Sequence, residues 1–235
     1  MHNKISSENL YVANRGWLIS RFHFSFAEYY NPQNVHFGVL RVLNDDIVQP
    51  STGFGTHPHE NMEIVSYCIE GELTHMDNMG NKETLRHGDV QYMSAGTGIT
   101  HSEMNDAPDE LLRFLQIWIL PDKQGATPQY GSKRFSKSDR HNKLLHIVSG
   151  KDINSVIQIN QDANIFVSEI EKGKQVVFSL DAGRQIYLVC IEGSLDINGI
   201  ELNKRDAVEI SNETQLTFKA LQNAHLLMIE MAQIK

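Results

Sequence analysis

The stretch Cys68-Ile-Glu-Gly-Glu-Leu73 recurs in the second half of the chain as Cys190-Ile-Glu-Gly-Ser-Leu195. Shortly after each copy, Leu85-Arg-His-Gly-Asp-Val-Gln-Tyr-Met-Ser94 is echoed by Leu202-Asn-Lys-Arg-Asp-Ala-Val-Glu-Ile-Ser211. Each copy has an apolar run, a Glu-Gly turn and a second turn that carries an aspartate, in the same order. Apolar runs bounded by tight turns are typical of β-strands, and a repeat of such runs indicates a duplicated unit. The sequence therefore predicts two copies of one small β unit.

Similar runs of β-branched and aromatic residues occur along the whole chain, and no long stretch has a helical period. They include Val35–Val42, Glu63–Ile69, Arg113–Ile119, Gln175–Leu180 and Gln185–Ile191. Many short strands joined by tight turns are typical of antiparallel barrels and sandwiches. We therefore expect an all-β fold.

The boundary between the copies is predicted in the polar, basic stretch Gly131–Lys143. Such a stretch can bind phosphate or nucleic acid, but in a chain of net charge -8 a solvated linker is the better interpretation. The predicted domains are residues 1–135 and 136–235. Cys68 and Cys190 occupy equivalent strand positions in different copies, so we expect both thiols to be buried and reduced.

Composition narrows the functional classes. The 235 residues are 40% hydrophobic and 21% charged, which is typical of a folded globular protein. No apolar run approaches the roughly 20 residues that a membrane span needs, and the N-terminal residues show no secretory signal. Net charge -8 argues against a general nucleic-acid binder, and two cysteines cannot form a disulfide framework. We expect a cytoplasmic monomer that binds neither nucleic acid nor membrane.

Histidines are concentrated in the first half, where eight of the eleven lie at or before His101. His57 and His59 are spaced i and i+2, so on a strand they project from one face, and Glu63 has the same parity. Imidazole is the commonest ligand of transition metals. Taken alone, this pair is a weak signal, because ordinary surface or core histidines often show the same spacing.

A second pair strengthens the signal. The glycine-rich loop Ala95–Gly98 leads to His101 and Glu103, which are again at i and i+2. Three histidines and a carboxylate on two strands would suit a borderline divalent metal and leave positions open for substrate. Parity places both Glu63 and Glu103 on the inner face, so the identity of the carboxylate ligand stays open at this point.

These two segments resemble the two cupin motifs, and more closely those of the pirin family of bicupins. The matching stretches are Phe24–Tyr30, Leu40–Asp46, Gly53–His59, Asp77–Lys82, Met93–Glu103 and Gln116–Ile119. The resemblance implies two jelly-roll cupin domains in tandem, with metal ligands at His57, His59, His101 and Glu103. It leaves Glu63 as a pocket carboxylate. The second copy has no His-x-His and carries Phe218 near the position that maps to His101, so we expect no metal there.

The resemblance also implies a function, that of a quercetin 2,3-dioxygenase, which opens a flavonol ring with O₂ and releases carbon monoxide. The implied metal is Fe(II), with Cu, Ni, Mn, Co or Zn as alternatives. Glu103 is the expected base for the flavonol hydroxyl, and Glu63 is the reserve candidate. Phe54, Met62, Tyr92, Met93 and Ile99 either line the pocket or its rim or belong to the ordinary barrel core, and both interpretations stay open. We expect His75 and His87 at the rim or in solvent. The main rival is an iron-binding regulatory protein without turnover, and a third possibility is an isomerase or sugar-binding cupin, whose activity would not need O₂.

Overall fold

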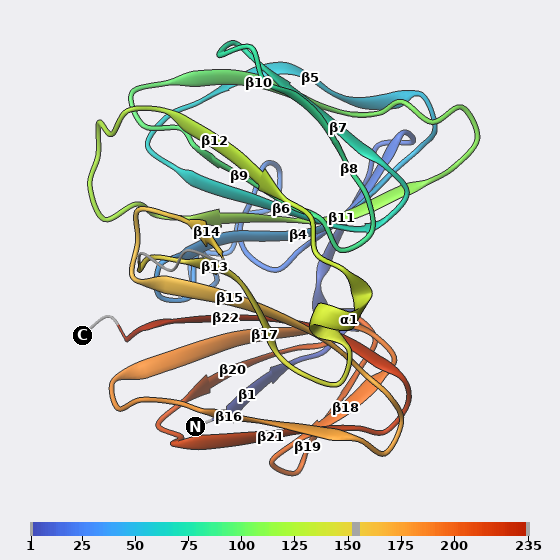
Figure 1. Cartoon of the computed structure of the whole chain (residues 1–235), viewed down its shortest axis with the longest axis vertical. Coiled ribbons are helices and arrows are strands. Elements are labelled where there is room, and N and C mark those ends of the chain that lie inside the picture. Colours follow the sequence, from blue (N-terminus) through green and yellow to red (C-terminus); the bar gives the residue numbers. More distant parts are fainter. Residues whose placement is uncertain (1, 152–155, 234–235) are drawn as a thin grey trace. The chain divides into compact units, whose positions relative to one another are not determined.

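The computed structural model describes residues 2–151 and 156–233, and nearly all of their regular structure is β-strand (Figure 1). Within these ranges the only helical segments are η1 (Ser7–Asn9) and α1 (Lys137–Arg140). No helix in the described ranges has the length and apolarity needed to cross a membrane. The predicted all-β fold is confirmed.

The chain divides into two compact units. The first unit contains Tyr11–Phe135 together with Ile159–Gln161, and the second contains Met1–Leu10, Ser136–Gln158 and Asp162–Lys235. The predicted division at 135/136 differs from this in two places. Residues before Leu10 belong to the second unit because β1 pairs with β20 there, and Ile159–Gln161 belong to the first because Gln161 Nε2 donates to the carbonyl of Leu120 at 2.7 Å.

The first unit is built from two antiparallel sheets. Its seven-stranded sheet has the order β12-β9-β6-β11-β4-β3-β2, with β2 (Tyr11–Asn14), β3 (Leu18–Phe22), β4 (Leu40–Val48), β6 (Glu63–Glu70), β9 (Val90–Ser94), β11 (Leu112–Ile119) and β12 (Gln129–Lys133). Its four-stranded sheet has the order β5-β10-β7-β8, with β5 (Thr52–His59), β7 (Leu73–Asp77), β8 (Lys82–Leu85) and β10 (Ile99–Asn105). Alternate residues of the facing sheets meet in a core, in which Phe114 and Cys68 of the large sheet pack with Leu73 and Leu85 of the small one.

The second unit repeats this plan. Its seven-stranded sheet has the order β1-β20-β17-β22-β15-β13-β14, with β1 (His2–Ile5), β13 (Leu145–Ser149), β14 (Ile157–Gln158), β15 (Ala163–Ile170), β17 (Arg184–Glu192), β20 (Ala207–Ser211) and β22 (Ala224–Ala232). Its four-stranded sheet has the order β16-β21-β18-β19, with β16 (Gln175–Ser179), β18 (Ser194–Ile197), β19 (Ile200–Asn203) and β21 (Gln215–Ala220). The strands that carry the repeated sequence take equivalent places in the two units, which confirms the predicted duplication.

The predicted linker is more ordered than its composition suggested. Gly131–Lys133 is the end of β12 and pairs with β9, and the following residues form α1. Arg140, the last residue of α1, is buried and donates from Nε to Glu169 at 2.6 Å. Cys68 and Cys190 are both buried free thiols, as expected, and burial raises the pKa of each to about 12.

Candidate metal centre

Three histidines meet where β5 and β10 pair in the small sheet of the first unit. Antiparallel register sets His101 opposite His57, and Ile99 opposite His59. The ring centroids are 4.5 Å apart for His57 and His101, 4.8 Å for His57 and His59, and 4.9 Å for His59 and His101. One ring nitrogen from each histidine lies within 4.8 Å of the others, so the three form a group that could hold a metal ion. The structure thus brings together all three predicted histidines.

The histidine nitrogens have the chemistry that a metal requires. His57 Nδ1 donates to the carbonyl of Gly55 at 2.7 Å, so that the other ring nitrogen, Nε2, is the one that can bind a metal. That Nε2 faces His101 Nε2 at 3.1 Å. Burial, followed by the neighbouring histidines, lowers the pKa of His59 to about 4 and that of His101 to about 3. Both rings are therefore neutral near pH 7, the form in which imidazole binds a transition metal.

Glu103 lies next to this cluster on β10 and is buried. Its Oε1 accepts hydrogen bonds from Ser66 Oγ at 2.9 Å and Gln91 Nε2 at 2.8 Å, and its Oε2 accepts one from Gln116 Nε2 at 2.6 Å. A carboxylate oxygen of Glu103 forms a second group with His101 and His75, so the two groups share His101. The four residues named by the family resemblance are therefore neighbours. Of these four, His57, His59 and His101 form one close group, and Glu103 belongs to the other group through His101.

Glu63 does not point inward, and that expectation was wrong. The carboxylate accepts a hydrogen bond from Ser94 Oγ at 2.7 Å and one from the backbone N–H of Asn160 at 3.1 Å. Parity counted from His59 predicts an inward Glu63, but Asn61, which lies between the two strands, has φ 49° and breaks the alternation. On β6 it is Ser66 that faces Glu103, and Glu63, three residues earlier, lies on the opposite side of the sheet.

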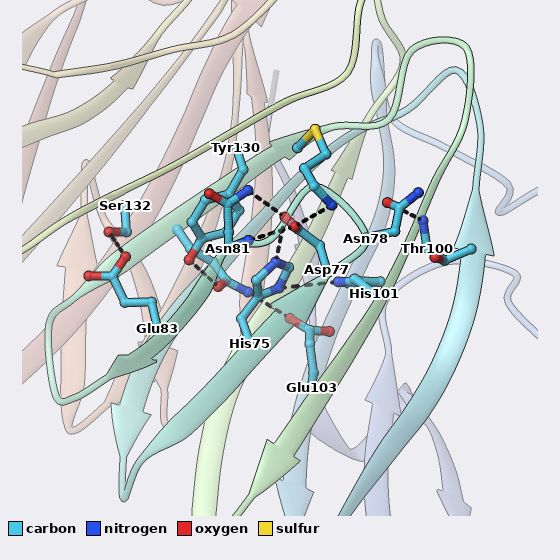
Figure 2. A network of polar contacts seen from close by, with 12 residues as sticks. His75, Asp77, Asn78, Asn81, Glu83, Thr100, His101, Glu103, Tyr130 and Ser132 are labelled. Carbon is cyan, nitrogen blue, oxygen red and sulfur yellow. Dashed lines mark hydrogen bonds and ion pairs between the residues drawn. The ribbon is translucent and has the colours of Figure 1, made fainter.

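His75 is a component of the centre that the sequence interpretation placed at the rim. Its side chain is fully buried on β7, and its Nδ1 lies 3.3 Å from His101 Nδ1 (Figure 2). Its Nε2 lies 3.2 Å from Asp77 Oδ2, and the Tyr130 ring stacks on the imidazole with centroids 4.4 Å apart. A signal was available, because His75 follows the apolar residue Leu73 at i+2 and so shares its inward face. His87 is exposed in a turn, as expected.

An apolar wall flanks the histidines. Met93 and Ile99 are buried in one cluster, against which Met62 and Trp118 pack. Trp118, which the sequence interpretation missed, meets His59 edge to face with ring centroids 4.9 Å apart. Its buried Nε1 has no hydrogen-bond partner among the described residues. Tyr92, a candidate for the lining, donates its hydroxyl to Gln129 at 2.7 Å, while Phe54 packs on Trp17.

An open pocket lies directly beside His59. Its lining comes from the ends of β5 and β10 and the turn after β7: Pro58, His59, Glu60, Asn78, Gly98, Ile99 and Thr100. The glycine-rich loop predicted to deliver His101 thus also forms part of the pocket wall. Of the three histidines, His59 lines this pocket.

Comparison with known proteins identifies the family. The family model described as pirin matches residues 6–119, and that of the quercetinase C-terminal cupin domain matches residues 146–231. A pirin-like protein of Caulobacter vibrioides is 44% identical over 221 residues, which is 94% of this chain and 95% of the relative. The chain belongs to the pirin family. Its two units are accordingly the two cupin domains of a bicupin, as the sequence resemblance implied.

Other pirin relatives extend the comparison. A protein of Escherichia coli named quercetin 2,3-dioxygenase is 38% identical over 222 residues, 94% of this chain and 95% of the relative. The crystal structure of the bacterial pirin YhhW from Escherichia coli in complex with nickel(II) matches with a TM-score of 0.94 and 35% identity, covering 100% of both chains. A divalent metal is therefore bound by a pirin with this fold.

The register of the second cupin of this pirin shows what replaces the histidine cluster. In the first cupin, His75 lies opposite Glu103 across β7 and β10. At the equivalent place after the repeated Glu-Gly turn, Ile197 lies opposite Phe218 across β18 and β21. Phe218 is therefore the counterpart of Glu103 and lies two residues from the counterpart of His101, near that position as expected.

Leu216, two residues earlier on β21, takes the place of His101 and pairs with Phe178, just as His101 pairs with His57. Every counterpart of the centre is apolar and contributes to the core of the second cupin: Phe178, Leu180, Ile197, Leu216 and Phe218. Among the described residues, both groups able to hold a metal lie in the first cupin.

Proposed function

We propose that this pirin is a dioxygenase that uses one divalent metal to cleave a flavonol such as quercetin with O₂ and to release carbon monoxide. The observation that carries the proposal is the close group of His57, His59 and His101. Burial keeps His59 and His101 neutral near pH 7, and His59 lines an open pocket. The relative named quercetin 2,3-dioxygenase, at 38% identity, supports the choice of reaction.

We propose His57, His59, His101 and Glu103 as the metal ligands. The donor set fits a borderline divalent ion, since imidazole nitrogens and one carboxylate suit iron, nickel, copper, cobalt, manganese and zinc. Fe(II) is our preferred metal. When bound, such an ion supplies Lewis acidity, which lowers the pKa of a hydroxyl group that reaches it.

Glu103 is the group that we propose accepts the flavonol hydroxyl proton. An ionised carboxylate has about four lone-pair positions. Oε1 already accepts two hydrogen bonds and Oε2 accepts one, from Gln116, so one lone pair of Oε2 is left. That lone pair would serve in turn as the metal ligand and as the proton acceptor. The three donors also fix the carboxylate in one orientation, as a positioned general base requires. Glu63 is hydrogen-bonded to Ser94 and Asn160 and is not needed for this step.

The apolar residues beside His59 bear on which substrate would fit the site. Met62 and Trp118 are partly buried on the cluster of Met93 and Ile99, and the Trp118 ring meets His59 edge to face. A flat aromatic substrate would pack against such apolar side chains, whereas a sugar would leave its hydroxyl groups without hydrogen-bond partners. This contrast favours the flavonol-like substrate over a sugar ligand. We further propose that the protein is cytoplasmic, since its two cysteines are buried free thiols and form no disulfide, and that it acts as a monomer.

The deciding experiment mixes iron-loaded protein with quercetin in air and follows the loss of the flavonol absorption band together with the release of carbon monoxide. The expected result is turnover by the wild type and none by His101→Ala. Turnover that persists without O₂ would indicate an isomerase. Iron binding with no more flavonol loss than His101→Ala shows would reject the dioxygenase and favour the iron-binding regulatory role.

A further inference from the structure

We propose that His75, held by Asp77, is a positioning residue that fixes the tautomer of His101 and so presents the Nε2 of His101 to the metal. The inference rests on the proposed metal centre but not on the dioxygenase reaction. It assigns a role to a buried histidine outside the proposed ligand set. The evidence is the chain of polar contacts drawn in Figure 2.

The series of polar contacts starts at Asp77, whose carboxylate accepts hydrogen bonds from the turn that follows β7. Oδ1 accepts from the backbone N–H of Met79 at 2.9 Å and of Asn81 at 3.0 Å, and Oδ2 accepts from Asn81 Nδ2 at 2.8 Å. A carboxylate that accepts several hydrogen bonds is held in its ionised form and can only accept more. His75 Nε2, 3.2 Å from Oδ2, must therefore be the donor.

This assignment determines the next two atoms. The proposal takes His75 in its neutral form, in which a proton on Nε2 leaves a lone pair on Nδ1 and Nδ1 accepts. His101 Nδ1, 3.3 Å away, must then donate. The proton of the neutral His101 ring is thereby placed on Nδ1, and its Nε2 carries a free lone pair directed at His57 Nε2, 3.1 Å away.

The proton of the His57 ring is also placed on Nδ1, but by a different hydrogen bond. Its Nδ1 donates to the backbone carbonyl of Gly55, which leaves Nε2 free as well. Two bare nitrogens at 3.1 Å repel each other, and a cation that both can bind removes that repulsion. A carboxylate or carbonyl that accepts the second N–H of a ligating histidine is the usual way in which proteins orient metal ligands. Here the carboxylate of Asp77 acts on His101 through the ring of His75.

The ring of His75 is itself held in place. Tyr130 stacks on it with an interplanar angle of 13°, and the Tyr130 hydroxyl donates to Gln91 Oε1 at 3.3 Å. Gln91 Nε2 in turn donates to Glu103. The same group of side chains therefore orients both His101 and Glu103.

The second cupin supplies an independent comparison. There Leu216 stands for His101 and Ile197 stands for His75. If His75 were only a core residue, the second cupin could have a histidine at the position of Ile197 even though it has none at the position of Leu216. A histidine that serves His101 has no function once His101 is absent, so their joint replacement agrees with the proposed role.

The test measures the affinity for Ni²⁺ by competition with a chromophoric chelator, without reference to turnover. His75→Phe keeps the stacking on Tyr130 but removes both hydrogen bonds, and it should weaken Ni²⁺ binding by about 10- to 100-fold. His75→Asn retains an acceptor near the position of Nδ1 and should bind more tightly than His75→Phe. His87→Phe, at an exposed turn, is the matched control and should bind like the wild type.

Three outcomes would distinguish failure of the metal centre from failure of the positioning role and from a different set of ligands. If the wild type binds no Ni²⁺, the proposed metal centre fails. If it binds Ni²⁺ and His75→Phe binds equally well, only the positioning role fails. If His75→Phe abolishes binding while His57→Ala retains it, the metal lies in the group of His75, His101 and Glu103, and the role proposed here is wrong.

A second measurement does not depend on the fold of any variant. Long-range ¹H–¹⁵N NMR spectra of the metal-free wild type report which ring nitrogen of His101 carries the proton. The proposal requires the proton on Nδ1. A proton on Nε2 would overturn it.

Discussion

His57 Nε2 and His101 Nε2 face each other across β5 and β10 at 3.1 Å, although the Nδ1 of His57 already donates to Gly55. This pair has two lone pairs where a cation would bind. A ligand that binds only the folded state stabilises it by mass action, by about 2.7 kcal/mol at a free concentration 100 times the Kd.

We therefore expect Ni²⁺ to raise the melting temperature of the wild type by several degrees and a chelator to reverse the rise. His57→Ala should show no such shift. The measurement is thermal unfolding followed by circular dichroism. A shift of equal size in His57→Ala would contradict the assignment of this pair as ligands.

Glu63→Gln should separate the two acidic residues that the sequence left as candidate bases. Because its carboxylate binds Ser94 and Asn160, the substitution should leave Ni²⁺ affinity and flavonol turnover within about twofold of the wild type. It should lower the free energy of unfolding by about 1 to 3 kcal/mol, the effect of disturbing buried hydrogen bonds. Turnover rates and urea denaturation test the two effects.

Glu103→Gln is the matched comparison. It keeps the size of the side chain but replaces one acceptor by a donor among three groups that already donate, so turnover should be lost. If Glu63→Gln lost turnover and Glu103→Gln kept it, the roles proposed for the two carboxylates would be reversed.

Asp46 should make stability depend on pH. It is buried on β4, and burial raises its pKa from 3.8 to about 7, despite a hydrogen bond from Ser20 that lowers it. Between pH 4 and 7 the folded state therefore holds a proton that the unfolded state has lost. The contribution of this residue to stability falls by up to about 1.4 kcal/mol per pH unit as the pH rises through this window, and it levels off above pH 7.

Asp46→Asn removes this dependence, so the variant should gain stability relative to the wild type as the pH rises from 5 to 7. Urea denaturation at both pH values gives the difference. Burial lowers the pKa of His23 to about 4, which gives the opposite slope, but that slope is common to both proteins and cancels in the comparison. A constant difference between pH 5 and 7 would show that Asp46 does not titrate in this range.

Phe218→Ala tests the second cupin. Phe218 is fully buried in the core of that unit, and removing a buried phenylalanine costs about 3 to 5 kcal/mol. The number of metal ions bound per chain should remain one. Elemental analysis together with chemical denaturation checks both statements, and a second equivalent of metal in the wild type would contradict the single centre.

The sequence predicted the fold and the histidine cluster because both depend on local patterns. The Cys68 and Cys190 repeats marked the duplication, and strand spacing alone placed His57 and His59 on one face. The errors arose where pairing between strands decides the result. Parity across Asn61 predicts an inward Glu63, but the positive φ of Asn61 ends the alternation. His75 was judged by its nearness to a turn, while its burial depends on strands that are distant in sequence.

The replacement of histidines by Phe178, Leu180 and Leu216 in the second cupin has an evolutionary consequence. A barrel that keeps imidazoles and a carboxylate inside gives up part of the apolar burial that stabilises folding, and active sites commonly trade stability for chemistry in this way. After duplication, this trade-off is confined to one half of the chain. With the metal centre proposed for the first cupin, substitutions at equivalent positions would affect metal binding in the first half and folding in the second.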